Sequence, residues 1–139
     1  MTGVQTCALP IWDLDGFRVL NDGLGRALGN QMLRIVGSKL RSFFEPNGGL
    51  VARISGDGYA VVLANAPERF ETSQLIQQAM NELTEPVYPD GGEDGVAASA
   101  SVGIVVEQVD EANVDEMIRS AEITLHRAKI GRASCRERV

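Results

Sequence analysis

The sequence lacks the features that mark membrane, nucleic-acid-binding or disulfide-stabilised proteins. No apolar run approaches the roughly 18–20 residues that a membrane-spanning helix needs. Acidic residues outnumber basic ones by 19 to 13, and the resulting net charge of −6 argues against a nucleic-acid-binding surface. The two cysteines, Cys7 and Cys135, stand near opposite ends and support no conclusion about the redox compartment. There is no internal repeat or low-complexity tract.

What is present suffices for one globular domain. The chain has 139 residues, of which 44% are hydrophobic, enough for a single core. Residues 1–11 and 130–139 resemble translated sequencing-adaptor sequence rather than evolved protein. We therefore expect one domain over residues 12–129 and leave both ends out of the predicted fold. An acidic domain of this kind can still bind a nucleotide if metal ions bridge the charges.

Apolar periodicity divides residues 12–129 into seven elements in the order β-α-β-β-α-β-α. A first strand ends near residues 13–15, and a helix follows from about residue 22 or 24 to residue 44. Two β-rich runs, 50–54 and 59–63, flank a turn at 55–58 and indicate a hairpin. Helices are expected at 67–84 and 114–128, with a strand at 96–106 between them. Hairpins pair strands antiparallel, so the order predicts an α+β fold with helices packed on a sheet.

Carboxylates stand at two of the predicted turns. The hairpin turn carries Asp57 between two glycines, where an acid lies close to backbone N–H groups and a metal-bound phosphate can bind. The same composition is typical of a plain surface turn. Asp13 and Asp15 alternate along the first strand and are expected on one face. They are either metal ligands or caps of the turn that opens at Gly16.

Three stretches, taken in order, resemble the motifs of the GGDEF (diguanylate cyclase) family. They are the run WDLDGFRVLNDGLGRALGN at residues 12–30, the hairpin ARISGDGY at 52–59 and the helix AEITLHRAK at 121–129. The resemblance implies a palm-like, ferredoxin-related and mostly antiparallel sheet flanked by helices, with the hairpin tip at the active site. In an intact member, two metal-bound GTP molecules on the two subunits of a dimer condense to cyclic di-GMP.

The resemblance also assigns metal-binding roles. Asp13 matches a carboxylate ligand, Leu14 matches a residue that offers its backbone carbonyl, and Asp57 stands at an acidic position of the hairpin. The expected ion is Mg²⁺, which prefers hard oxygen ligands. Gly58, however, stands where the family has a metal-binding glutamate. Mg²⁺ binding is therefore expected to be weak or lost, and Asp57 is left as the residual catalytic carboxylate.

Further matched positions imply a nucleotide site, formed by Phe17, Arg18, Asn21, Asn30 and Lys129. The first two would present backbone amides to the phosphates, Asn21 would read guanine, and Lys129 would neutralise phosphate charge. Asn30 replaces an acid that accepts two guanine hydrogen bonds, and an amide offers one acceptor. The residues alone leave other interpretations open: Asn21 and Asp22 can cap a helix N-terminus, and Lys129 can be a solvated cation at a helix end.

These departures predict a degenerate GGDEF domain of a bacterial cyclic di-GMP signalling protein, catalytically inactive and regulatory, with GTP binding retained as an input. Ser55 adds a Cβ where the family has a glycine close to phosphate, and the family's Arg-x-x-Asp product-inhibition site has no counterpart at residues 46–50. Homodimerisation or a linked EAL phosphodiesterase domain is expected, in the cytoplasm, alone or as part of a membrane-bound sensor. The alternatives are an active diguanylate cyclase and an interaction scaffold that binds no nucleotide.

Overall fold

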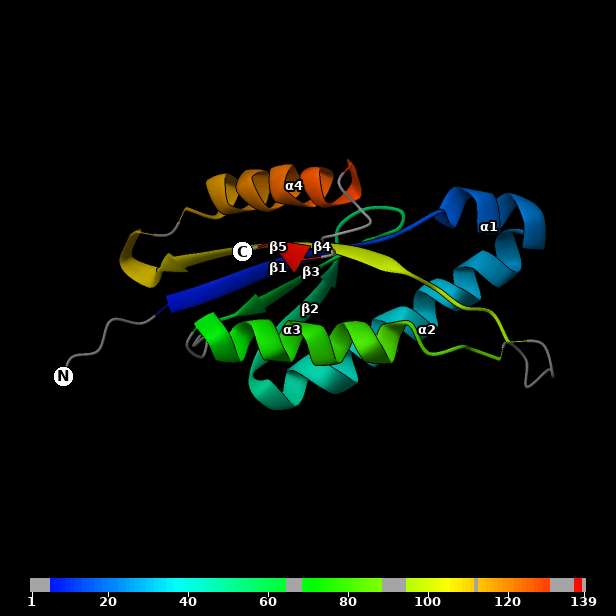
Figure 1. Ribbon diagram of the computed structural model, residues 1–139, viewed down its shortest axis with the longest axis horizontal. Helices are drawn as coiled ribbons and strands as arrows, with labels where there is room; N and C mark the ends of the chain where they lie inside the picture. The colour runs from blue at the N-terminus through cyan, green and yellow to red at the C-terminus, as the bar shows by residue number, and fades with distance from the viewer. Residues whose placement is uncertain (1–5, 65–68, 89–94, 112, 131–136, 139) are drawn as a thin grey trace.

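The computed structural model describes residues 6–64, 69–88, 95–111, 113–130 and 137–138 (Figure 1). The strands are β1 (Thr6–Leu14), β2 (Gly49–Arg53), β3 (Gly58–Leu63), β4 (Ala100–Gln108) and the two-residue β5 (Glu137–Arg138). The helices are α1 (Phe17–Leu24), α2 (Arg26–Phe44), α3 (Arg69–Leu83) and α4 (Val114–Ile130), with short 3-10 turns η1 (Glu45–Asn47) and η3 (Val109–Glu111). No helix in these ranges is both long and apolar enough to cross a membrane.

The strands form one sheet in the order β2-β3-β1-β4-β5. The first four are antiparallel, and β5 pairs with β4 in parallel. The predicted hairpin is confirmed: β2 and β3 pair in the register Leu50↔Val62 and Ala52↔Ala60. The chain therefore has the α+β fold that the sequence predicted, with β1 at the centre of the sheet.

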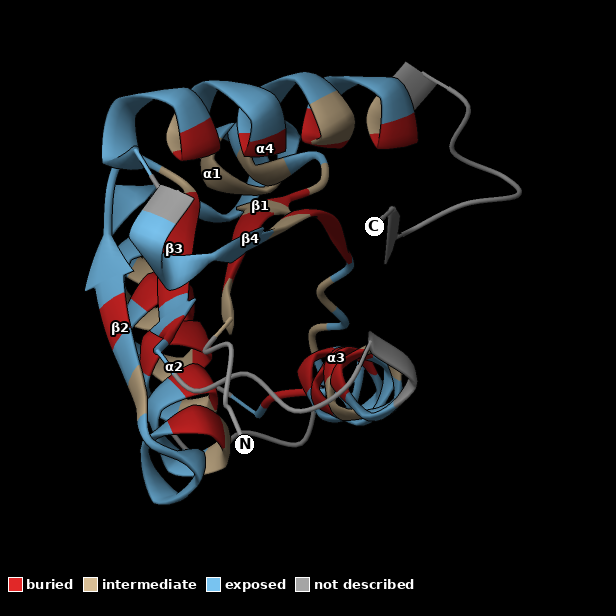
Figure 2. Ribbon diagram, turned by 90° about the vertical axis from the view of Figure 1, so that its left-hand side faces the viewer, coloured by how far each residue is buried: buried red, intermediate tan, exposed pale blue. Residues whose placement is uncertain are grey.

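Helices cover both faces of the sheet, with α2 and α3 on one side and α4 on the other (Figure 1). The larger core cluster combines inward residues of α2 and α3 with Trp12, Val61 and Val102 of the strands. The smaller cluster lies under α4, where Met117, Ala121 and Leu125 pack against β1 and β3. Figure 2 shows the buried residues of α3 and α4 on the sides that face the rest of the molecule.

The helices bury apolar side chains at the three- and four-residue spacing from which they were predicted. In α3 the buried residues include Ile76, Ala79, Met80 and Leu83. In α2 Met32, Val36 and Leu40 are buried, and Phe44 lies in the core with Phe43 packed against it. The first residue of α4, Val114, is 68% exposed.

Several predicted boundaries also differ from the structure. Strand β1 ends at Leu14, as predicted, but it begins at Thr6, so it includes residues 6–11, which the sequence prediction left out of the fold. These six residues pair with β4, and Ala8 and Ile11 also pair with β3. The last long strand begins at Ala100, not at Val96, which forms only an isolated bridge with Val87. The 67–84 prediction overlaps α3, and residues 67 and 68 lie outside the described part of the chain.

The greatest local difference is an additional helix, α1. The sequence predicted a turn after Gly16 and one helix up to residue 44. The structure instead has two helices, separated at Gly25, whose φ of 94° and ψ of 156° lie outside the helical region. Gly16 precedes α1 with a left-handed φ of 64°, a conformation that favours glycine. The two glycines thus set the positions at which α1 begins and ends.

Candidate functional site

The carboxyl end of β1 lies beside the hairpin turn. Asp13 is the register partner of Gly58 on β3, and the backbone N–H of Leu14 donates to the carbonyl of Asp57 at 3.1 Å. Two segments about 40 residues apart in sequence are thereby fixed by backbone pairing. The turn lies next to the first acidic residue of β1, as the sequence predicted.

Asp13 forms an ion pair with Lys129 from the last turns of α4. Lys129 Nζ lies 2.7 Å from Asp13 Oδ2, and the two side chains are 34% and 24% exposed. The other carboxylate oxygen, Oδ1, is buried and has no hydrogen-bond partner among the described residues. Burial raises the pKa of Asp13; Lys129 opposes this rise, whereas the neighbouring Asp57 adds to it. Lys129 is therefore not simply a solvated cation, and Asp13 and Asp57 lie close enough to repel each other.

Asp15 has a different environment. Its two carboxylate oxygens accept hydrogen bonds from Ser99 Oγ at 2.9 Å and Ser101 Oγ at 2.8 Å. Its backbone N–H also donates to the Ser99 carbonyl at 2.8 Å. The sequence left open whether Asp13 and Asp15 are metal ligands or turn caps. In the structure Asp15 joins the end of β1 to the start of β4, whereas Asp13 lies next to Asp57.

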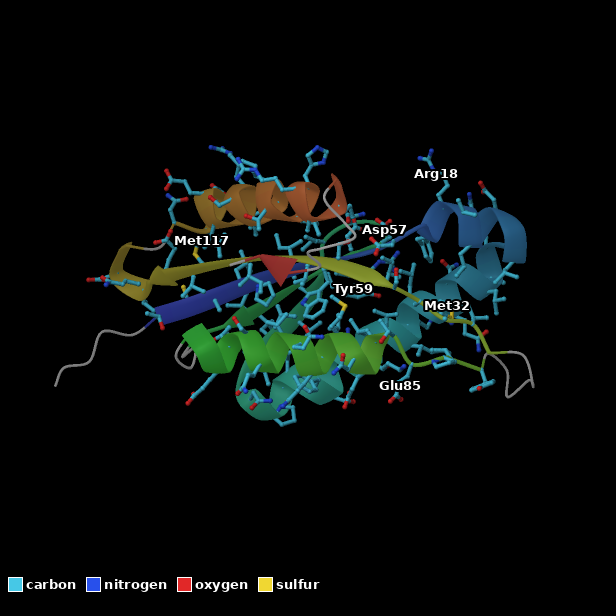
Figure 3. All side chains as sticks on the ribbon, in the orientation of Figure 1. Arg18, Met32, Asp57, Tyr59, Glu85 and Met117 are labelled. Carbon is cyan, nitrogen blue, oxygen red and sulfur yellow. The ribbon has the colours of Figure 1, made fainter. Side chains whose placement is uncertain are left out.

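A cavity of about 360 Å³ opens between α1, the start of α2 and the hairpin turn. It is lined by five of the residues that the sequence singled out, namely Phe17, Arg18, Asn21, Asn30 and Asp57, together with Arg26, Arg53 and Gly56. Figure 3 shows Arg18 on α1 and Asp57 at the turn, both at this end of the molecule. Asp13 lies near Asp57 and is paired with Lys129, but neither Asp13 nor Lys129 lines the cavity.

Two lining arginines were not identified as site residues from the sequence. Arg26 had no assigned chemistry, and Arg53 was treated only as part of a strand. Arg53 donates from Nη2 to the carbonyl of Gly56 at 2.7 Å and from Nε to the carbonyl of Ser55 at 3.3 Å. Its position directly before the turn is the signal that could have identified it, because a guanidinium there can reach turn carbonyls.

The close approach of α1 and α2 positions Asn21. A Cβ added at Gly29 of α2 would lie 3.1 Å from Asn21 Cγ and 3.3 Å from Phe17 Cζ, with Asn21 Oδ1 nearer still. Only a residue without a side chain therefore leaves room for the Asn21 amide. Asn21 lies within α1, whose preceding residue is Gly16, so the interpretation of Asn21 and Asp22 as a helix N-cap is wrong.

At position 58 of the hairpin turn, an added side chain would meet the hydroxyl of Ser55. Gly58 is buried, and a Cβ added there would lie 2.5 Å from Ser55 Oγ. The serine hydroxyl thus occupies the space next to the residue that lacks a side chain. Within the described ranges, no group of three or more His, Cys, Asp or Glu side chains is placed to hold a metal ion.

Comparison with known proteins matches this arrangement. The family model for the GGDEF domain of diguanylate cyclases covers residues 3–134. The chain belongs to the GGDEF family. GGDEF diguanylate cyclases normally use Mg²⁺.

Relatives with curated names differ in the activity that their names state. Cyclic di-GMP phosphodiesterase NbdA of Pseudomonas aeruginosa is 34% identical over 122 residues, which is 88% of this chain and 15% of NbdA. Diguanylate cyclase DgcP of Escherichia coli is 30% identical over 117 residues, which is 84% of this chain and 33% of DgcP. This GGDEF domain therefore spans a third or less of either relative.

Solved GGDEF domains have the same fold. That of YfiN (TpbB) from Pseudomonas aeruginosa superposes with a TM-score of 0.86 at 25% identity, covering 97% of this chain and 83% of that one. An EAL/GGDEF domain protein from M. capsulatus gives a TM-score of 0.82 at 28% identity, covering 91% and 80%. The present chain is thus a GGDEF domain of proteins that act in cyclic di-GMP signalling.

Proposed function

We propose that this GGDEF domain binds GTP in the cavity beside the hairpin turn, does not condense it to cyclic di-GMP, and serves as a regulatory module. The observation that carries the proposal is the contrast between a cavity lined by five of the expected residues and a buried Gly58, which the resemblance aligns with a metal-binding carboxylate. Nucleotide binding and catalysis depend on different groups. The chain keeps more of the nucleotide-binding residues than of the metal-binding carboxylates that catalysis needs.

The composition of the cavity supports nucleotide binding. Arg18, Arg26 and Arg53 place three guanidinium groups around it, suited to the phosphates of GTP. Asn21 and Asn30 add two amides, which can hydrogen-bond a base edge. Asn30 offers one acceptor where a carboxylate would accept from both guanine donors, so selection for guanine over adenine should be weak.

The metal-binding groups support one loosely held Mg²⁺ at most. The buried Asp13 Oδ1 has no protein partner among the described residues, and Asp57 lies nearby. These two carboxylates and the Leu14 carbonyl are oxygen donors of the kind that Mg²⁺ prefers. When bound, Mg²⁺ would neutralise triphosphate charge. Because Lys129 already neutralises Asp13, we expect the ion to bind weakly or not at all.

The absence of a metal-binding carboxylate at position 58 supports an inactive domain rather than a slow diguanylate cyclase. An electrostatic group of this type contributes on the order of 10² to 10³ in rate.

The relative NbdA, which is named as a cyclic di-GMP phosphodiesterase, supports a linked EAL phosphodiesterase domain as the element that the GGDEF domain regulates. We place this domain in the cytoplasm, acting as a homodimer or through the linked domain.

The first experiment measures GTP binding and product formation on the same sample. Isothermal titration with GTP and Mg²⁺ should show binding, and chromatography after long incubation should show no cyclic di-GMP. Arg18→Ala should weaken GTP binding by about 10-fold, which corresponds to about 1.4 kcal/mol. Arg119→Ala removes an equal charge from the exposed side of α4 and should leave binding unchanged. Product from the unmodified domain would show an active cyclase, and absence of GTP binding would show a scaffold.

The second experiment restores the hairpin turn. In Gly58→Glu alone, the new Cβ meets Ser55 Oγ, and the exposed serine side chain must rotate away to admit the carboxylate. In Ser55→Gly/Gly58→Glu that obstacle is removed, and Mg²⁺-dependent GTP binding should become tighter than in either single variant. If the double variant binds Mg²⁺ and GTP no better than the unmodified domain, position 58 is not the reason for the missing activity.

A further inference from the structure

A second cavity lies on the outer side of α2, next to the hairpin. It has a volume of about 280 Å³, and its walls include three arginines, Arg34 and Arg41 from α2 and Arg53 from β2. Ser38 also lines it, and Gly37 and Tyr59 contribute its floor. Among the residues that the structure describes, no carboxylate lines this cavity. Because three arginines line the cavity and no described carboxylate faces them there, the cavity is suited to a negatively charged ligand.

The charge of this part of the domain differs from that of the whole. Residues 17–53 carry six basic and two acidic side chains, whereas the whole chain carries 13 and 19. The side chains of Arg34 and Arg41 are exposed, and neither forms an ion pair or hydrogen bond with any residue in the described ranges. Both guanidinium groups are therefore available to a ligand.

The shape of the cavity follows from Gly37. Arg34 and Arg41 are seven residues apart, two turns of one helix face, which separates their Cα atoms by about 10.5 Å along the axis. Gly37 lies between them, and a Cβ there would be 3.3 Å from the Tyr59 ring, which fills the space below. A side chain at position 37 would close this hollow, so the glycine keeps a gap open between two arginines.

Tyr59 contributes a polar group but no negative charge. Its hydroxyl donates to the carbonyl of Leu33, and the residue is 4% exposed. It lies on the α2 and α3 side of the sheet (Figure 3). Burial raises the pKa of Tyr59, against the opposing charges of Arg53 and Arg41, which shows that both guanidinium groups lie near the phenol. The tyrosine therefore stays neutral and supplies no negative charge that would neutralise the arginines.

We propose that Arg34, Arg41 and Arg53 form a binding site for the phosphate groups of a small molecule, distinct from the GTP cavity but sharing Arg53 with it. Guanidinium groups bind phosphate oxygens through paired hydrogen bonds, and three of them match a ligand with two or more negative charges. The site lies on α2 and the last residue of β2, and none of residues 46–50 lines it. Arg53 lines both cavities and donates to the Ser55 and Gly56 carbonyls. A ligand that attracts Arg53 should therefore alter the hairpin turn.

The test uses pyrophosphate as the probe and amide NMR of the whole chain at constant ionic strength. We expect pyrophosphate to shift the amide signals of Gly37 and Ser38. In Arg34→Gln/Arg41→Gln these shifts should need at least about 10-fold more pyrophosphate, the equivalent of about 1.4 kcal/mol. The control Arg119→Gln/Arg127→Gln removes two exposed charges from α4 and should behave as the unmodified domain.

Three outcomes decide the proposal. Equal weakening in both double variants would show a non-specific charge effect and overturn it, as would shifts confined to the residues around Arg18. Shifts at Gly37 that survive Arg18→Ala, a variant that should weaken GTP binding, would support two separate sites. This last comparison also keeps the proposal independent of the proposed function, since pyrophosphate can bind here even if GTP does not bind at all.

Discussion

Replacing Gly103 should destabilise the domain more than any other glycine substitution outside the turns, because α4 lies directly on it. A Cβ at Gly103 of β4 would lie 2.5 Å from the backbone N of Leu125 and 2.9 Å from its Cα, with the Ala121 carbonyl also in the way. All three obstacles are backbone atoms, which cannot rotate aside as a side chain can. Ordinary contact begins at 3.4 Å, so α4 must retreat by about 1 Å in Gly103→Ala.

The size of the destabilisation by Gly103→Ala follows from the side chains that α4 buries against the sheet. Met117, Ala121 and Leu125 are each at most 8% exposed, and a gap of about 1 Å removes a quarter to a half of the dispersion attraction of such contacts. We expect Gly103→Ala to lower the free energy of unfolding by about 2–3 kcal/mol, the upper end for overpacking. For a domain of this size the melting temperature should fall by about 8–12 °C.

Urea unfolding followed by circular dichroism measures this loss. The matched control is Gly23→Ala, because Gly23 lies in α1 with no atom within 4 Å of an added Cβ. Alanine at that exposed helical position should stabilise by about 0.5–1 kcal/mol, so the two Gly→Ala changes have opposite signs. The reasoning fails if Gly103→Ala unfolds within about 0.5 kcal/mol of the unmodified domain, the range of surface substitutions.

Two further predictions concern polar groups. Asp15→Ala removes the acceptor of two serine hydroxyls and should lower the free energy of unfolding by about 1–3 kcal/mol, whereas Asp22→Ala, an exposed position in α1, should change it little in the same urea titration. Tyr59→Phe removes the hydrogen bond to the Leu33 carbonyl and should cost about 0.5–1.5 kcal/mol at neutral pH. Because burial raises the pKa of Tyr59 above its usual 10.0, the stability linked to its proton is complete below pH 10 and is lost as the pH rises through the folded-state pKa. The unfolding free energy should therefore fall less steeply above pH 10 in Tyr59→Phe than in the unmodified domain, and parallel curves would contradict this.

The sequence predicted the sheet more accurately than helices α1 and α2, which follow β1. The hairpin and the buried face of α3 followed from alternation and helical periodicity, which reflect burial directly. Helix α1 was missed because the run after Gly16 reads as a turn, with glycines at 16, 23 and 25. Its helical conformation depends on packing against Gly29 of α2, which is a tertiary contact. Glycine spacing alone cannot distinguish a break between two helices from a loop.

For the candidate site, the sequence named five of the residues that line the cavity and showed that position 58 carries no carboxylate, but it did not identify Arg26 and Arg53. Tertiary structure decided the partners of the two aspartates, because β4 brings two serines to Asp15 and α4 brings Lys129 to Asp13. The same holds for the two arginine-lined cavities, which combine residues from α1, α2 and β2. Contacts between segments distant in sequence follow from how the elements pack, and no local pattern records them.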